Sequence, residues 1–125
     1  WEAFLFGIPL GILTTAILWI NQFPDSKSDE IAGKNHLVVV LGLEKASWGY
    51  LTLMLMAFGS IYALAKYQII EQGALISLAA LPIALYYSYQ VTRNYNTRDL
   101  ANANWGTIGI HGITGILLII GVGYI

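Results

Sequence analysis

Four long apolar segments, separated by polar connections, dominate the pattern along the 125-residue chain. None of the four contains Asp, Glu, Lys or Arg, and each approaches the roughly 20 residues that a helix needs to cross a bilayer core. The segments are apolar on nearly all sides, whereas a helix of a soluble bundle carries a polar stripe. The pattern therefore predicts an all-α integral membrane helical bundle. Its four transmembrane helices are expected at approximately 3–20, 47–65, 74–91 and 107–125.

The composition agrees with a membrane location and excludes several functions. Hydrophobic residues make up 57% of the chain and charged residues 10%, whereas a soluble domain carries about 25% charged residues. The net charge of −1 provides no basic field for a nucleic acid, so the expected surroundings are the lipid bilayer. The absence of cysteine excludes disulfides, thiolate metal sites and a cysteine nucleophile.

The basic residues predict the orientation of the chain in the membrane. The first connection, 21–46, holds three lysines and the third, 92–106, holds two arginines, whereas the second, 66–73, holds one lysine. Since alternate connections share a side, five of the six basic residues lie together, and the positive-inside rule makes that side cytoplasmic. We therefore expect a cytoplasmic Asp-rich loop at 21–46 and an external C-terminus.

The stretch NQFPDSKSDEIAGK, residues 21–34, concentrates the charge of an otherwise apolar chain. Pro24 suits the first turn of a short helix, and Gly33 suits its end. Within that helix Asp25 and Asp29 lie four residues apart and share one face. Like charges at this spacing repel each other unless a cation lies near, and Mg²⁺ is commonly held by one or two carboxylates together with phosphate oxygens. A metal site is one interpretation, and a solvated loop is the other.

Polar neighbours of the two aspartates also leave alternatives open. Asn21 either satisfies the end of the first membrane helix or lines the polar mouth of a cavity. Lys34 is either solvated or in contact with a phosphate group. His36 is expected to be solvated or interfacial, just before the apolar run 37–41, which is too short to cross a membrane and is expected to lie over the mouth of the bundle.

Residues 20 to 42, INQFPDSKSDEIAGKNHLVVVLG, resemble the second aspartate-rich motif of the UbiA-type membrane prenyltransferases. The resemblance is closest to the branch that includes the 1,4-dihydroxy-2-naphthoate polyprenyltransferases. There a span ending in Asn is followed by DxxxD, by Gly-Lys or Gly-Arg, by a short apolar run and by a closing Gly. The stretch 92–112 is also similar to the loop between the family's last two helices. The matching positions in the motif are Asn21, Asp25, Asp29, Gly33, Lys34 and Gly42.

The resemblance implies a function for the charged stretch. Members of the family have a nine-helix bundle with two cytoplasmic aspartate-rich loops, which hold Mg²⁺ and through it the diphosphate of an isoprenoid donor. By this resemblance Asp25 and Asp29 are metal ligands, and Asn21 and Lys34 are substrate-binding residues. The implied reaction transfers a polyprenyl group from polyprenyl diphosphate to an aromatic acceptor that resembles a quinone precursor.

The resemblance covers only the C-terminal part of the family's fold. Residues 1–125 are therefore expected to form a single membrane region that is a fragment of a larger domain. The family's first aspartate-rich motif has no match in this sequence, so half of the implied metal site is missing. The chain alone is expected to be inactive, and its expected partners are a missing N-terminal half or other membrane subunits.

A non-catalytic membrane subunit of a pigment- or quinone-containing complex is the alternative function. His111 lies inside a membrane segment, where a histidine can be an axial ligand to chlorophyll or haem. Gly109, Gly112 and Gly115 would leave room for a flat ring. The other interpretation of His111 is a hydrogen bond to a neighbouring helix.

Glycines and a second polar cluster complete the pattern. Gly7 and Gly11, and the series at 106, 109, 112 and 115, are expected to be close-packing surfaces between helices. The polar cluster after the third membrane segment is either a positive-inside anchor or a rim that meets the diphosphate or the acceptor. The tyrosines before this cluster either lie at the membrane interface or line an isoprenoid channel. The cluster comprises Arg93, Asn94, Asn96, Arg98 and Asp99, and the tyrosines are Tyr86, Tyr87 and Tyr89.

Overall fold

The chain is built from helices that differ in length and in type. A computed structural model describes residues 1–97 and 100–124, and within these ranges it contains no strand. Four helical segments are long and apolar enough to cross a membrane, at Ala3–Ile31, Leu43–Lys66, Gln72–Asn94 and Leu100–Gly123. The all-α prediction and the prediction of four membrane helices are thus confirmed. The elements are α1 (Glu2–Ile31), α2 (Leu37–Leu41), α3 (Leu43–Lys66), the 3₁₀ helix η1 (Gln72–Ala80), α4 (Leu81–Asn94) and α5 (Leu100–Tyr124).

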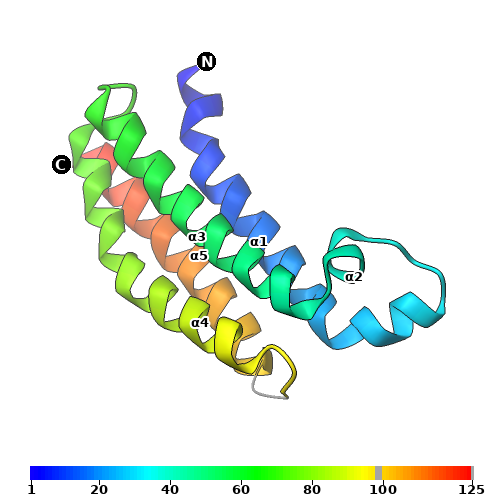
Figure 1. The fold of residues 1–125 in the computed structure, drawn as a ribbon. Helices are drawn as coiled ribbons and strands as arrows, with labels where there is room; N and C mark the ends of the chain where they lie inside the picture. The colour runs from blue at the N-terminus through cyan, green and yellow to red at the C-terminus, as the bar shows by residue number, and fades with distance from the viewer. Residues whose placement is uncertain (98–99, 125) are drawn as a thin grey trace.

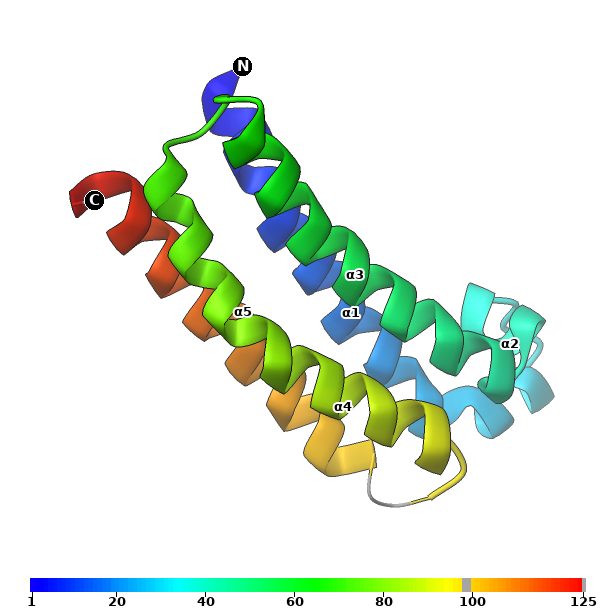
Figure 2. The ribbon, with the colours of Figure 1, turned by 60° about the vertical axis from the view of Figure 1, so that its left-hand side comes forward.

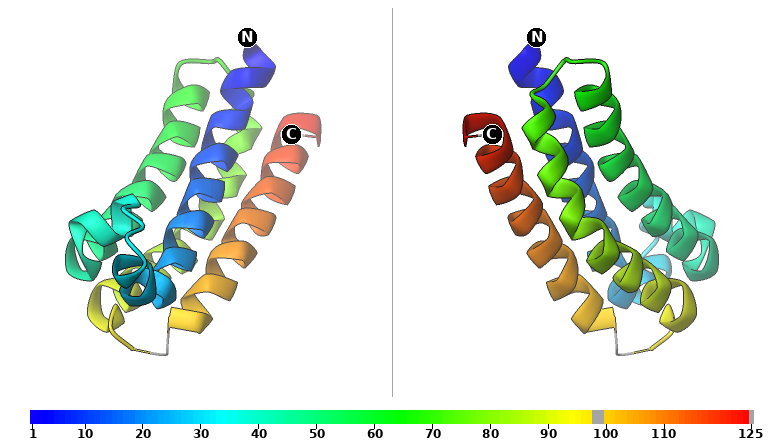
Figure 3. Two further views of the ribbon diagram at one scale, coloured as in Figure 1. Left: turned by 90° about the vertical axis from the view of Figure 1, so that its right-hand side faces the viewer. Right: turned by 90° about the vertical axis from the view of Figure 1, so that its left-hand side faces the viewer.

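The four long segments pack as a ring (Figure 1). Helix α1 contacts α3 and α5, and α4 contacts the same two helices from the other side. Both termini and the connection from α3 to η1 lie at one end of the bundle, whereas α2 and the connection from α4 to α5 lie at the other (Figures 2 and 3). We call this second end the motif end, because it contains residues 21–46.

A buried hydrogen bond connects opposite members of the ring. Tyr50 of α3 and Thr107 of α5 are both fully buried, and the Tyr50 hydroxyl oxygen lies 2.7 Å from Thr107 Oγ1. Thr107 Oγ1 donates its hydrogen to the carbonyl oxygen of Ala103, at 2.6 Å, so the Tyr50 hydroxyl is the donor to Thr107. An interhelical bond of this kind stabilises a membrane bundle by about 0.5–1.5 kcal/mol.

Many large hydrophobic side chains lie on the outer surface of the bundle. Leu18, Leu55 and Ile119 belong to a large set of exposed hydrophobic side chains spread over all the long helices. Monomeric soluble proteins rarely expose contiguous apolar patches of such extent. The bundle therefore presents a surface suited to lipid and to other membrane helices.

Helix α1 is longer than the sequence pattern predicts. It continues from Glu2 to Ile31, so the short helix expected to begin at Pro24 is the last part of α1 and extends it beyond the apolar segment. Pro24 has no N–H to donate to the carbonyl group of Ile20, which bends helices, and the axis of α1 changes direction in its last third (Figure 1). The expected loop 21–46 is largely helical as a result.

The third membrane segment is also divided at a proline. Pro82 stands in the first turn of α4, where its missing N–H costs nothing. The residues before it form the 3₁₀ helix η1, and the N–H of Leu81 donates to the carbonyl group of Leu78. That carbonyl group would otherwise need the N–H that Pro82 lacks. The change of helix type thus gives the carbonyl group of Leu78 a hydrogen-bond donor, as an apolar environment requires.

Gly121 of α5 lies directly against the backbone of Gly73 in η1. A Cβ atom at position 121 would collide with the carbonyl group of Gly73, whereas a Cβ atom at Gly123, two residues further on, would meet nothing within 4 Å. We expect Gly121→Ala to lower the free energy of unfolding by about 1–3 kcal/mol, the usual cost of overpacking. Thermal unfolding in detergent measures the change. Gly123→Ala is the control, and equal stability of the two variants would contradict the close approach.

Candidate functional site

The two aspartates of the motif lie on the last three turns of α1. Because the helix is continuous from Glu2 to Ile31, Asp25 and Asp29 are one turn apart on one face. Asp25 is exposed, and Asp29 is partly covered by the segment that follows the helix. Gly33 has a φ of 75°, which lets the chain reverse there, and the N–H of Lys34 then donates to the carbonyl oxygen of Asp29 at 2.8 Å.

Both carboxylate oxygens of Asp29 have a partner. Lys34 Nζ donates to Oδ1 at 2.9 Å, and His36 Nε2 lies 3.0 Å from Oδ2. The Lys34 side chain is 67% exposed, whereas those of Asp29 and His36 are 17% and 22% exposed. The lysine therefore approaches from solvent, and the histidine approaches from the protein side.

This arrangement favours an ionised Asp29. The apolar part of α1 ends near Ile20, so Asp29 lies on the helix beyond the membrane segment. The hydrogen bond from Lys34, followed by the one from His36, lowers the pKa of Asp29 below its usual value. In return, the hydrogen bond to Asp29 raises the pKa of Lys34. At neutral pH the pair consists of a carboxylate and an ammonium group.

His36 makes contacts that the sequence pattern does not reveal. Its Nδ1 accepts a hydrogen bond from the N–H of Val39 at 3.4 Å and so caps α2. Because Nδ1 is the acceptor, Nε2 carries the hydrogen that is donated to Asp29. Histidine is not among the favoured N-cap residues, so local sequence gave only the expectation of a solvated or interfacial side chain. The contact with Asp29 depends on the reversal at Gly33.

A hollow of about 840 Å³ lies at the motif end, between α1, α2, the start of α5 and the connection that precedes it. Asn21 lines this hollow, in agreement with the interpretation of Asn21 as part of a cavity mouth. Lys27 and Glu30 line it as well, whereas Asp25 and Asp29 do not. With 3.6 residues per turn, the two aspartates lie on the other side of α1. The structure thus brings together Asp29 and Lys34, and of these three residues only Asn21 lines the hollow.

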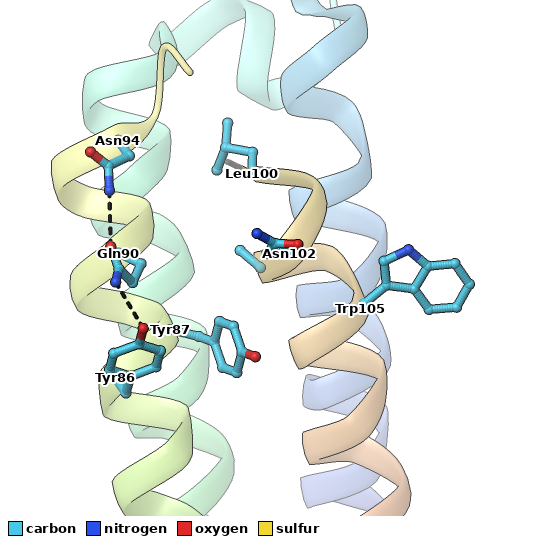
Figure 4. Close-up of a pocket in the computed structure, with 8 residues that line it drawn as sticks. Tyr86, Tyr87, Gln90, Asn94, Leu100, Asn102 and Trp105 are labelled. Atoms are coloured by element: carbon cyan, nitrogen blue, oxygen red, sulfur yellow. Dashed lines mark hydrogen bonds between the residues drawn. The ribbon is translucent and has the colours of Figure 1, made fainter. Parts of the chain in front are cut away.

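A second cleft, of about 390 Å³, opens between α4 and α5 at the motif end (Figure 4). Along α4, Asn94 donates to Gln90 at 2.9 Å and Gln90 donates to the Tyr86 hydroxyl at 3.0 Å. Tyr87 points toward α5, where its ring lies against Gly106, and Trp105 points away from the cleft (Figure 4).

Other side chains singled out in the sequence take more ordinary roles. His111 Nε2 lies 3.1 Å from Thr14 Oγ1 on α1, which confirms the interpretation of His111 as hydrogen-bonded to a neighbouring helix. Arg93 lies over the ring of Tyr89, at 5.5 Å from its centroid. Arg98 and Asp99, expected in the second polar cluster, lie outside the described residues.

The donor set of Asp25 and Asp29 fits part of a Mg²⁺ site. Within residues 1–97 and 100–124 no group of three or more His, Cys, Asp or Glu side chains is arranged to hold a metal ion. Mg²⁺ prefers carboxylate oxygens, and it commonly takes one or two from the protein and the rest from substrate phosphates and water. Two carboxylates one turn apart can supply that share if Lys34 releases Oδ1.

Replacing Lys34 by Gln removes the ammonium group that contributes most to the low pKa of Asp29. The pKa of Asp29 should therefore rise. A carboxyl group with a lowered pKa stabilises the fold at pH values above its unfolded-state pKa, and this stabilisation is lost as the pH falls through the folded-state pKa. Because its folded-state pKa is higher, the variant should lose less stability than the wild type when the solution is acidified. Carboxyl ¹³C NMR of labelled protein in detergent measures the pKa. Lys27→Gln, which removes a charge from α1 on the side of the hollow, should leave it unchanged, and equal values for all three proteins would contradict the contact.

Comparison with known proteins gives one result. The family model described as the UbiA prenyltransferase family matches residues 1–120. No curated protein and no solved structure matches the chain. The family match covers nearly the whole sequence, including α1 with its two aspartates and the helices that pack around it. The chain therefore belongs to the UbiA prenyltransferase family.

Proposed function

We propose that this chain supplies one half of a Mg²⁺-dependent site that transfers a polyprenyl group from its diphosphate to an aromatic acceptor. Membership of the UbiA family points to prenyl transfer in general. The resemblance of residues 20–42 to the 1,4-dihydroxy-2-naphthoate branch supports an acceptor that is a quinone precursor. In this reaction the allylic carbon–oxygen bond breaks, the diphosphate leaves with the electron pair, and a ring carbon of the acceptor forms the new bond and loses a proton.

The observation that carries the proposal is the pairing of two carboxylates on α1 with an exposed, exchangeable lysine. Asp25 and Asp29 present hard oxygen ligands on one helix face, and the 67% exposed Lys34 occupies Oδ1 of Asp29. When bound, Mg²⁺ supplies the positive charge that stabilises the departing diphosphate. Lys34, released from Oδ1, is then close enough to neutralise phosphate oxygens at the same place.

Two further features support a shared site. The aspartates lie on the side of α1 opposite the hollow of this chain, and residues 1–97 and 100–124 provide no group of three or more potential metal ligands there. Helices that precede this sequence, or another membrane subunit, would provide the second set of ligands. The chain by itself is then inactive, and its apolar outer surface provides the area on which those helices pack.

The orientation in the membrane is part of the proposal. Residues 21–46 and the connection from α4 to α5 lie at the same end of the bundle (Figure 3). Five of the six basic residues belong to these two connections. This supports a cytoplasmic motif end. The acceptor and the diphosphate head group of the donor would then meet Asp25 and Asp29 at the cytoplasmic face, and the C-terminus would be external.

Asp25→Asn and Asp29→Asn in the full-length protein test the proposal. Each removes a charged metal ligand worth several kcal/mol in the transition state, so each should lower kcat/KM by about 100-fold or more. The assay follows Mg²⁺-dependent transfer from a panel of polyprenyl diphosphates to 1,4-dihydroxy-2-naphthoate, with the protein in nanodiscs.

Glu44→Gln is the matched control, since Glu44 is an exposed carboxylate near the same end of the bundle. It should retain the wild-type rate and the wild-type dependence on Mg²⁺. Near-wild-type rates in both aspartate variants would overturn the assignment of the site.

A further inference from the structure

We propose that His36 is a positioning residue, which orients Asp29 so that Oδ2 is held by the protein and Oδ1 is presented to the metal. This inference rests on the proposed function and adds a residue to it. Histidine and carboxylate pairs of this kind commonly orient metal ligands from behind. Here the usual order is reversed, because the carboxylate is the ligand and the histidine supports it.

The two oxygens of Asp29 are not equivalent. Oδ1 faces Lys34, a mobile type of side chain that is 67% exposed, and Oδ2 faces His36, which is 22% exposed. An incoming cation can replace the lysine, because the ammonium group gains full hydration or a phosphate partner when it leaves. His36 has no comparable route to solvent, so its bond to Oδ2 persists when Oδ1 changes partner.

The opposite side of the imidazole ring fixes its orientation. Nδ1 accepts the N–H of Val39, which sets the tautomer and places the hydrogen on Nε2. Helix α2 is anchored in the bundle core because Val38, the neighbour of Val39, is fully buried. The ring is therefore held between the core, through α2, and the carboxylate on α1. Rotation of the Asp29 side chain would break its hydrogen bond to His36, because α2 holds the ring in place and cannot move with the carboxylate.

Two isosteric substitutions separate these functions of the ring. The amide group of asparagine occupies the place of Nδ1, and asparagine is a good N-cap residue, so His36→Asn keeps the cap of α2 and loses the donor to Asp29. The amide nitrogen of glutamine occupies the place of Nε2, so His36→Gln keeps the donor to Asp29 and loses the cap. Asn35→Ala, at an exposed neighbouring position, is the control.

The measurements are the dissociation constant for Mn²⁺ as a probe of the metal site, by electron paramagnetic resonance, and the Tm, both on the full-length protein in nanodiscs. His36→Asn should weaken Mn²⁺ binding by about tenfold, the low end of the loss seen for supporting residues of metal sites, and keep the wild-type Tm. His36→Gln should bind Mn²⁺ as the wild type does and have a lower Tm. Asn35→Ala should change neither value.

Wild-type Mn²⁺ affinity in His36→Asn would overturn the positioning role and leave His36 as a helix cap. Loss of affinity in His36→Asn and His36→Gln alike, in proportion to a lower Tm, would also overturn it. Asp29→Asn distinguishes this failure from failure of the proposed function. If Asp29→Asn abolishes Mn²⁺ binding, the metal site stands whatever His36 does, and if Asp29→Asn binds Mn²⁺ normally, both proposals fall.

Discussion

The continuity of α1 beyond the apolar segment is the constraint on which the site depends. Helix α1 lacks one backbone hydrogen bond at Pro24 but continues to Ile31, so that one element is anchored in the bundle and also carries the charged residues. If the helix ended near Asn21, as the pattern of polarity suggests, the two aspartates would belong to a flexible connection with no fixed relation to the bundle. As built, the direction of Asp25 and Asp29 is set by the packing of α1 against α3 and α5.

The sequence predicts most of the fold because the membrane leaves few choices. In an apolar solvent the backbone N–H and C=O groups must hydrogen-bond to each other, so a long uncharged segment forms a helix. All four segments predicted in this way are helical in the structure. The ends of the helices are less predictable, because a helix can extend into water once it is nucleated in the bilayer. This explains why α3 begins before Ser47 and α5 before Thr107. The 3₁₀ geometry of η1 follows from Pro82 together with packing, and packing is not readable from one segment.

The candidate site is predicted only in part. Asp25, Asp29 and Lys34 can be found from spacing and from the resemblance to UbiA-type enzymes, because these residues form a local motif. The role of His36 depends on a reversal of the chain at Gly33 and on a cap that is not a common one, so neither composition nor periodicity indicates it. The glycine series shows the same division. Close packing is predicted for six glycines, and a Cβ atom would meet the ring of Tyr87 at Gly106 and the side chain of Leu10 at Gly115. At Gly7, Gly11, Gly109 and Gly112 a Cβ atom would meet nothing within 4 Å in the described chain, so the prediction is wrong for these four.

The contact between Gly73 and Gly121 has a mechanical consequence for the whole bundle. It closes the distance between η1 and α5 at the end far from the motif, while at the motif end α4 and α5 stand apart around a cleft (Figure 4). The third and fourth membrane segments therefore touch backbone to backbone at Gly73 and Gly121, and toward the motif end the ring of Tyr87 lies between them against Gly106. A side chain larger than hydrogen at position 121 would push η1 away from α5 and so change the angle between these two membrane segments.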